Sequence, residues 1–312
     1  MTTIDSTSTG IRVGTAPAES EFDELDRTPV RTFWQLVRQR FLQHKLAVAG
    51  LVVMIILIVL AIVVPLATGD LYGKTSLTSV NQPPSLTAPL GTDDLGRNLF
   101  VRLMKGLQTS LIVGFSSVLI IVAVGVTVGA LAGFAGGAAD NVLMRIVDVV
   151  LSIPTFFLIV TLVAFFGGGD ARVIILAIAF TGWTLAARLV RAEFLHLREM
   201  DFVQAARALG ASDRRIILRH MLPSAMAPVV VAATLVVADS VVTEATLSYL
   251  GFGIRPPEAS LGNMLNAAMD NIFRNPILVW YPAITLILVV LSASLLGDGL
   301  RDALDPRQRI DA

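Results

Sequence analysis

The sequence contains no cysteine and only three histidines among its 312 residues. The lack of cysteine excludes disulfide bonds, thiolate metal sites and cysteine nucleophiles. His44, His196 and His220 are scattered along the chain, which argues against a metal site, because metals need ligands at defined spacings. Charged residues are scarce, at 15%, and the formal net charge is zero, so nothing in the charge pattern points to nucleic acid as a partner.

Motifs of catalysis are missing as well. The sequence has no GxxxxGK phosphate loop, no HExxH pair and no serine elbow with a partner histidine. The chain is therefore predicted to be no enzyme, to hold no cofactor and to hydrolyse no ATP by itself. Any chemical energy that it uses would have to come from another chain.

Apolar residues, by contrast, are abundant. They make up 54% of the chain, and the mean hydropathy is +0.74. This composition is too apolar for a soluble protein of this size and predicts an all-α integral membrane protein. A crossing needs about 20 apolar residues, and six runs of that kind predict a six-helix transmembrane domain over 46–298. The runs cover residues 46–68, 108–133, 142–166, 172–190, 224–249 and 277–298.

The ends of the chain differ from this domain. Residues 1–30 are rich in Ser, Thr, Gly and acidic residues, which predicts a disordered tail that lacks the pattern of a cleavable signal peptide. In residues 31–45 an apolar stripe opposes Arg38 and Arg40. This pattern favours a helix in the membrane interface, with a continuation of the first spanning helix as the alternative. Residues 299–312 are expected to form a C-terminal tail.

The placement of Lys and Arg predicts the sidedness of each segment, because cytoplasmic loops carry an excess of both. Most of the 24 Lys and Arg residues fall on one side if the N-terminus is cytoplasmic. The C-terminus and the polar segment 191–223 are then also cytoplasmic, while segments 69–107 and 251–276 are extracytoplasmic. These outer segments are expected to close a pore or receive a partner, or else to be solvated connectors. One side of a surface helix in the first of them would be lined by Leu99, Phe100, Leu103 and Met104.

The fourth spanning run is bounded by Arg172 and Arg188, and its helix is expected to continue into the polar segment.

Residues 201–223 then predict a helix, a tight turn and a second helix. Asp201 and Gln204 have the spacing of a reciprocal N-terminal cap, and Gly210 suits a left-handed residue after the last turn. Ser212 is a good N-cap for the second helix, and Pro223 stops that helix or starts the next one. The first helix has an apolar face formed by Phe202, Ala205, Ala206 and Leu209.

Two carboxylates, Asp239 and Glu244, lie in the fifth apolar run. Carboxylates inside a membrane usually face a bundle interior or a water-filled cavity, so both are candidates for a pathway or a gate. Five residues separate them by about 140° on a helix, so they cannot share a face. Glu244 lies near the outer boundary, where a hydrogen bond to a neighbouring loop is the alternative. Asp148, three residues after Arg145, is expected to form a local ion pair.

Four ordered segments together resemble a known family. QAARALG followed by HMLP at 220–223 is similar to the EAA loop of bacterial ABC importer permeases, whose pattern is Glu-Ala-Ala, three residues, Gly, nine residues and Ile-x-Leu-Pro. Ala205, Ala206, Gly210, Leu222 and Pro223 match, whereas Gln204 replaces the Glu and His220 replaces the Ile. GTDDLGRN at 91–98, TEATLSYLGFGIRPPEASLGNML at 243–265 and LGDGLRDALDPR at 296–307 resemble the C-type permease of dipeptide and oligopeptide importers, a group that includes nickel and glutathione importers.

This resemblance covers roughly residues 31–309 and implies a type I ABC importer permease in a bacterial inner membrane. It implies a second permease chain of the B type, two cytoplasmic ATPase subunits that hold ATP and Mg, and an extracytoplasmic solute-binding protein. The residues expected to couple to an ATPase subunit are Phe202, Gln204, Ala205, Ala206, Leu209, Gly210 and Pro223.

The cargo and the class of the protein stay open from the sequence. The cargo could be a dipeptide, an oligopeptide, glutathione or a nickel complex. A proton-coupled carrier would instead use Asp239 or Glu244 as a relay and need no ATPase, although no internal repeat of the kind found in such carriers is visible. A membrane scaffold or channel component is the third class.

Overall fold

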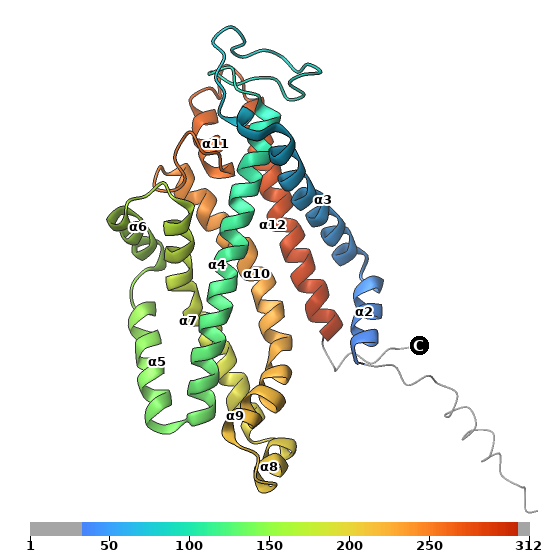
Figure 1. Cartoon of the computed structure of the whole chain (residues 1–312), viewed down its shortest axis with the longest axis vertical. Coiled ribbons are helices and arrows are strands. Elements are labelled where there is room, and N and C mark those ends of the chain that lie inside the picture. Colours follow the sequence, from blue (N-terminus) through green and yellow to red (C-terminus); the bar gives the residue numbers. More distant parts are fainter. Residues whose placement is uncertain (1–32, 305–312) are drawn as a thin grey trace, which may run out of the picture.

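The computed structural model describes residues 33–304, and these residues form helices joined by loops (Figure 1). The predicted tail at 1–30 and the residues after 304 lie outside the described part. The helices are α2 (Phe33–Gln43), α3 (Lys45–Thr68), η1 (Gly69–Tyr72), α4 (Leu99–Ala135), α5 (Gly137–Leu151), α6 (Thr155–Phe166), α7 (Ala171–Arg198), α8 (Asp201–Ala208), α9 (Asp213–Arg215), η2 (Ile216–Met221), α10 (Leu222–Tyr249), α11 (Leu261–Met269) and α12 (Ile277–Leu304).

Five helical segments in the described range are long and apolar enough to cross a membrane. They are α3, α4, α7, the continuous stretch Asp213–Tyr249 and α12. The pair α5 and α6 makes a sixth crossing if it is counted as one span, but its helices are bent by 82°. The single helix expected over 142–166 is therefore wrong. The break precedes Pro154, a residue that cannot donate a backbone hydrogen bond and disfavours a helical conformation at Ile153.

The helix α4 corrects the surface helix that was predicted within the outer segment 69–107. It begins at Leu99, because the Asn98 side chain accepts hydrogen bonds from the N–H groups of Phe100 and Val101 at 3.1 and 3.3 Å. Residues 99–107 are thus the first turns of a 37-residue helix and not a separate surface helix. Three of the four residues assigned to that surface helix, Leu99, Leu103 and Met104, are buried.

The most extensive contact between two helices of the described chain joins α4 and α7, which lie side by side (Figure 1). Glycines on α4 make this approach possible. A Cβ atom at Gly129 would lie 2.5 Å from the carbonyl oxygen of Ala187, and one at Gly133 would lie 2.6 Å from Cβ of Phe194. As predicted, α7 continues past Arg188 to Arg198, so its last turns lead directly toward the polar segment.

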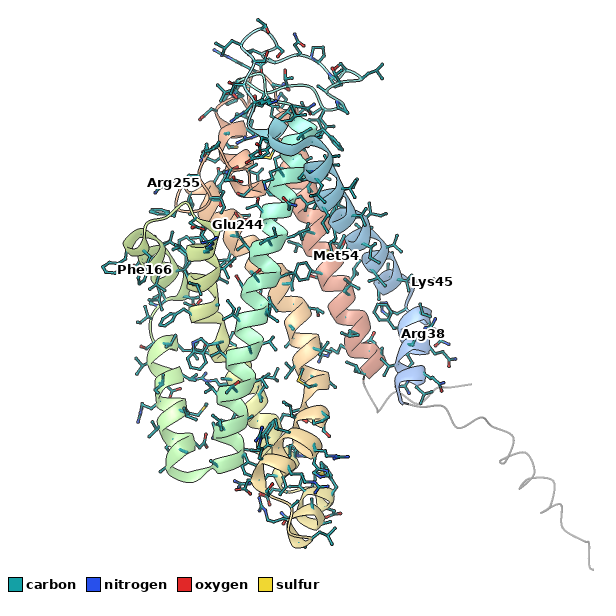
Figure 2. All side chains as sticks on the ribbon, viewed as in Figure 1. Arg38, Lys45, Met54, Phe166, Glu244 and Arg255 are labelled. Atoms are coloured by element: carbon teal, nitrogen blue, oxygen red, sulfur yellow. The ribbon has the colours of Figure 1, made fainter. Side chains whose placement is uncertain are left out.

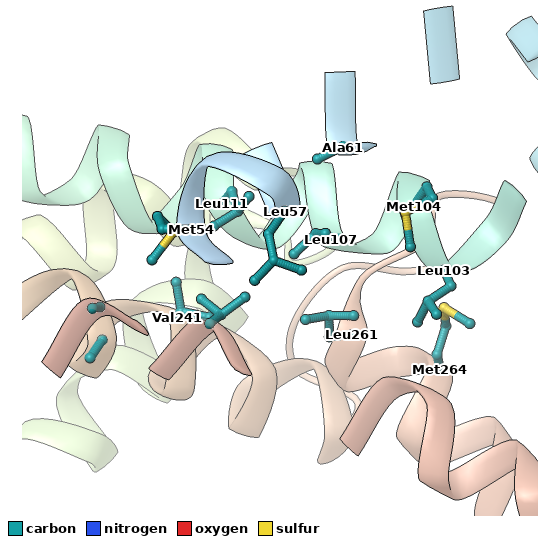
Figure 3. Close-up of a cluster of buried hydrophobic side chains, with 13 residues drawn as sticks. Met54, Leu57, Ala61, Leu103, Met104, Leu107, Leu111, Val241, Leu261 and Met264 are labelled. Atoms are coloured by element: carbon teal, nitrogen blue, oxygen red, sulfur yellow. The ribbon is translucent and has the colours of Figure 1, made fainter. Parts of the chain in front are cut away.

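A hydrophobic cluster in one half of the bundle holds α3, α4, α10, α11 and α12 together (Figure 3). Leu57, Leu107, Val241 and Leu261 meet in it from four of these helices. A second cluster packs α7 against the polar segment and the first turns of α10. In Figure 1, α8 and α9 occupy one end of the molecule, while α11 and the segment between η1 and α4 occupy the other.

The helix α2 is separate from α3, so the first spanning helix does not simply continue into it. His44 lies between the two helices and caps α3, since its Nδ1 atom accepts a hydrogen bond from the N–H of Ala47 at 3.1 Å. Its Nε2 atom lies 3.5 Å from a carboxylate oxygen of Asp302 on α12. The location of α2 in a membrane interface stays a prediction.

Candidate functional site

The polar segment between α7 and α10 has the expected order of helix, tight turn and helix. The reciprocal cap of Asp201 and Gln204, however, is wrong. Met200 is the N-cap of α8 and no side chain caps this end, because the helix starts with Asp201 in its first turn. There the acidic side chain still complements the helix dipole. The Gln204 amide instead donates to the backbone oxygen of Arg198 at 3.2 Å, which ties α8 to the end of α7.

Gly210 has the left-handed conformation that the sequence predicts, with a φ of 78°. Its N–H donates to the Arg207 oxygen at 3.0 Å, and the Ala211 N–H donates to the Ala206 oxygen at 3.1 Å. These two bonds form a Schellman motif, which ends α8 and reverses the chain. No atom lies within 4 Å of a Cβ built on Gly210, so the requirement at this position is conformational and not spatial.

The two faces of α8 have different neighbours. Val203 is fully buried among residues of α7, η2 and α10, including Phe194 and Met221, and Ala206 packs against the same cluster. On the other side, Phe202 is 43% exposed and Leu209 is 88% exposed. Ala205 is exposed as well. The predicted apolar face is thus present at the surface of this chain, with Ala206 turned partly inward, while Val203 anchors the helix.

The turn before Pro223 is a π-helix over Ile216–Met221. The N–H of Leu222 donates to the oxygen of Ile217, one residue farther back than in an α-helix. Pro223 follows as an early residue of α10, so it starts that helix and does not stop the preceding one. Because the stretch Asp213–Tyr249 is continuous, a displacement of the polar segment would be passed directly into a membrane span.

Two ion pairs join α7 to α5 above the polar segment. Arg191 donates to both carboxylate oxygens of Asp140, at 2.5 and 2.6 Å. Arg188 donates to Asp148 at 2.5 Å, so the expected local pair of Asp148 with Arg145 is wrong. Sequence spacing reveals a neighbour one turn away, but it cannot reveal a partner on another helix.

Glu244 is fully buried where α4, α10 and α11 meet (Figure 2). Ser110 donates to one carboxylate oxygen at 2.6 Å and Ser248 donates to the other at 2.7 Å. The geometry is that of a carboxylate that joins helices to a neighbouring outer segment.

Asp239 has a different environment. It lines a cavity of about 320 Å³ between α4, α6, α7 and α10, and its side chain is exposed there. The other lining residues are uncharged, and most are apolar, such as Ile121, Ile178 and Val236. Glu244 is not part of this lining. The sequence made both intramembrane carboxylates candidates for a pathway or a gate. In the structure, only Asp239 lines this cavity, whereas Glu244 is buried between helices.

The outer segments hold contacts that sequence reasoning missed. The Tyr72 hydroxyl donates to Glu258 at 3.0 Å, and Lys105 lies 5.3 Å from the centre of the Tyr72 ring. Arg102, only 4% exposed, points its guanidinium at the backbone oxygens of Tyr72 and Pro257, each at 3.5 Å. No local sequence signal pairs these distant positions. Within the described range, no group of three or more His, Cys, Asp or Glu residues could hold a metal ion.

Comparison with known protein families decides which family the chain represents. A family model described as "binding-protein-dependent transport system inner membrane component" matches residues 125–310, which include the polar segment and both intramembrane carboxylates. The chain belongs to this family. A second model, the "N-terminal TM domain of oligopeptide transport permease C", matches residues 32–84 of the permease.

Curated relatives of the permease match it over most of its length. It is 36% identical to the oligopeptide transport system permease protein OppC of Bacillus subtilis, over 89% of this chain and 91% of that protein. It is 39% identical to the glutathione transport system permease protein GsiD of Pectobacterium atrosepticum, over 91% and 93%. With the dipeptide transport system permease protein DppC of Bacillus subtilis it shares 37% identity, over 93% and 90%.

A solved inward-facing structure of the MetNI methionine ABC transporter has the same fold. Its TM-score is 0.54 at 23% identity, and the match covers 65% of this chain and 96% of that one. The predicted fold class and location are thereby confirmed, since the chain is an all-α inner membrane permease with the fold of a type I ABC importer. Its family consists of transport components and not of catalysts.

Proposed function

We propose that this permease forms half of the translocation pathway of an ATP-driven importer for di- or oligopeptides. The observation that carries the proposal is the exposed apolar face of α8 on a chain that has no phosphate loop. An apolar helix face at the surface fits a groove of a partner, as an amphipathic helix does in many complexes. The ATPase subunits would supply the chemistry that this chain lacks.

Four of the coupling residues that the sequence singles out take part in this proposal, together with one buried residue that it did not. Phe202, Ala205 and Leu209 would enter the groove of an ATPase subunit, and Gly210 would hold the turn behind them. Val203 transmits the movement, because its buried side chain connects α8 to α7 and α10. ATP-driven closure of the ATPase pair would then move this end of the bundle as a rigid body and switch the pathway between inward and outward states.

The cargo follows from the relatives. Permeases named for oligopeptides, dipeptides and glutathione share 36%, 37% and 39% identity with this chain. Since glutathione is itself a small peptide, a peptide is the chemical class common to all three. The further partners in the proposal are a second permease of the B type and a solute-binding protein on the outer side. The outer segments fastened by Tyr72, Arg102 and Glu258 offer that protein an ordered surface.

The experiment that tests this function is purification of the intact complex from the native membrane. Co-purifying chains are identified by mass spectrometry, and ATP hydrolysis in proteoliposomes is measured with dipeptides, tripeptides, glutathione and nickel complexes. We expect two ATPase subunits, a second permease and stimulation by peptides. Uptake that persists without the ATPase subunits and collapses with the proton gradient would instead establish a proton-coupled carrier.

A further inference from the structure

Asp239 lies near the middle of a membrane span. It stands ten residues before the end of α10 at Tyr249, which is about 15 Å along the helix axis. A hydrocarbon core is about 30 Å thick, so this carboxylate is far from either surface. Carboxylates at such depth are rare and usually face water or a partner charge.

The cavity around Asp239 contains no group that neutralises it. None of the lining residues is Lys, Arg or His, and no hydrogen bond or ion pair of the Asp239 carboxylate is found in the described part of the chain. The hydroxyl of Thr181 on the opposite wall already donates to the Ile178 oxygen at 3.0 Å. An ionised carboxylate in this position needs a cation or water, because transfer into apolar surroundings without a partner is costly.

The contrast with Glu244, five residues later, shows that the lack of a partner for Asp239 within this chain is not common to both carboxylates. Glu244 uses both oxygens to accept hydrogen bonds from hydroxyl groups of α4 and α10 and is closed off from solvent. Asp239 points to another side of the same helix, into a cavity of about 320 Å³. A packing role accounts for Glu244, and no contact in the described residues gives Asp239 such a role.

We propose that this cavity is a binding subsite for the protonated amino group of the translocated molecule, with Asp239 as its counter-charge. The proposal rests on the proposed function, because peptides carry such an amino group. The volume lies at the lower end of the range of small-ligand sites, about 300 to 1,000 Å³. Apolar walls formed by Ile121, Ile178 and Val236 accept varied side chains without selecting one.

A single ionic contact also suits a transport pathway. Binding must be favourable enough for entry and weak enough for release. A single carboxylate among apolar walls favours a cargo with a protonated amino group over one with a neutral or anionic group. The cavity offers no second charged side chain that would hold the cargo and slow its release. Asp239 is therefore a specificity-determining residue of the permease, separate from selection by the solute-binding protein.

The first test probes the cavity in the assembled complex with thiol reagents. The chain has no cysteine, so Ala233→Cys places one reactive thiol in the cavity wall. Its labelling by a cationic aminoethyl and an anionic sulfonatoethyl methanethiosulfonate is followed by mass spectrometry of this chain, after normalisation to a small free thiol. We expect a cation preference of about tenfold with Asp239 present and almost none with Asp239→Asn.

Two results of this labelling would overturn the subsite. A thiol that neither reagent reaches means that the cavity is not open to water. A preference that Asp239→Asn leaves unchanged means that another charge sets the potential. Labelling of the Ala233→Cys protein with the native Asp239 requires no substitution of the carboxylate. It therefore shows whether water reaches the cavity and whether the cation is preferred, even if the Asp239→Asn variant fails to assemble.

The second test is uptake of trialanine by the complex with its binding protein in ATP-loaded proteoliposomes. At limiting peptide, Asp239→Asn is expected to lower uptake about tenfold, since the ammonium group then meets a neutral amide oxygen in place of a carboxylate, whereas Asp239→Glu restores most of it. Asp298→Asn, an exposed aspartate on α12 outside the cavity and the outer segments, is the matched control and should change uptake less than about twofold. Co-purification of the second permease should be unchanged.

The remaining outcomes separate the subsite from the proposed function. Loss of the second permease from the Asp239→Asn complex would show that Asp239 pairs with that chain, and normal uptake by the variant would show that the carboxylate is not used. Either result overturns the subsite and leaves the importer intact. A wild-type complex without peptide-stimulated ATP hydrolysis would overturn the proposed function, while the labelling ratio would still report on the cavity.

Discussion

Ser110 on α4 donates a 2.6 Å hydrogen bond to Glu244 on α10, across 134 positions of sequence. The same hydroxyl accepts the N–H of Leu261 at the start of α11 at 3.3 Å. Ser110 thus links α4 to α10 through the carboxylate and to α11 through its own hydroxyl oxygen. Because the network is fully buried, each of its polar groups depends on the others for a partner.

We predict that Glu244→Ala destabilises the permease strongly. The change leaves the hydroxyls of Ser110 and Ser248 without their acceptor, and a buried unsatisfied group costs about 1 to 3 kcal/mol. Glu244→Gln should be milder, since its amide oxygen still accepts one hydroxyl. The readout is the apparent Tm of the purified complex, with Asp70→Asn as an exposed acidic control. An unchanged Tm together with lost transport would favour the alternative role of Glu244 as a gate.

At Gly210 we predict that Gly210→Val strongly reduces transport and peptide-stimulated ATP hydrolysis. Its φ of 78° costs a residue with a side chain about 1 to 2 kcal/mol, and a β-branched residue resists it most. Gly210→Asn is the matched control, because asparagine tolerates the left-handed region and there is open space for its Cβ. Normal peptide-stimulated hydrolysis in an assembled Val variant would remove Gly210 from the coupling mechanism.

Gln204→Glu is predicted to change transport little, by less than about twofold. The substitution abolishes the 3.2 Å donation to the Arg198 oxygen, since a carboxylate has no proton to give. This bond is exposed to solvent, where water replaces it at a cost of about 0.5 to 1.5 kcal/mol. Initial rates of peptide uptake provide the measurement. A loss of tenfold or more would show that the amide itself contacts the ATPase subunit.

Much of the fold could be predicted from the length of apolar runs, yet two boundaries could not. The first turns of α4 contain Arg102. In the sequence a charged residue argues against a membrane-spanning helix, and only the structure shows that Arg102 is buried. The run 142–166 is apolar on both sides of Pro154, so hydropathy alone hides the bend of 82°. Pro154 was the available local signal for the break.

The candidate site divides in the same way. The conformation of Gly210 could be predicted from its residue type, because glycine adopts a positive φ without the strain that a side chain causes. The partners of Asp148 and Glu244 could not be predicted, since Arg188 and Ser110 come from other helices. The Asp201 cap failed for a local reason. Its spacing to Gln204 was right, but α8 starts one residue too early for Asp201 to be the N-cap.

The two faces of α8 allow docking and folding to be separated. Leu209 is 88% exposed and Val203 is fully buried, although both are apolar residues of the same short segment. We predict that Leu209→Asp lowers co-purification of the ATPase subunits about tenfold and leaves the Tm of the isolated permease unchanged, because a buried leucine contact is worth about 1.5 to 3 kcal/mol only once the partner is bound.

Val203→Ala should show the opposite pattern, because it removes buried methyl groups from the cluster that joins α8 to α7 and α10. We expect a destabilisation of about 2 kcal/mol and a lower Tm, with ATPase subunits still bound below the melting transition. Both variants are measured for Tm in detergent and for ATPase content after affinity purification. If Leu209→Asp lowered the Tm as much as Val203→Ala, the exposed face would belong to the fold of this chain, and docking through α8 would be wrong.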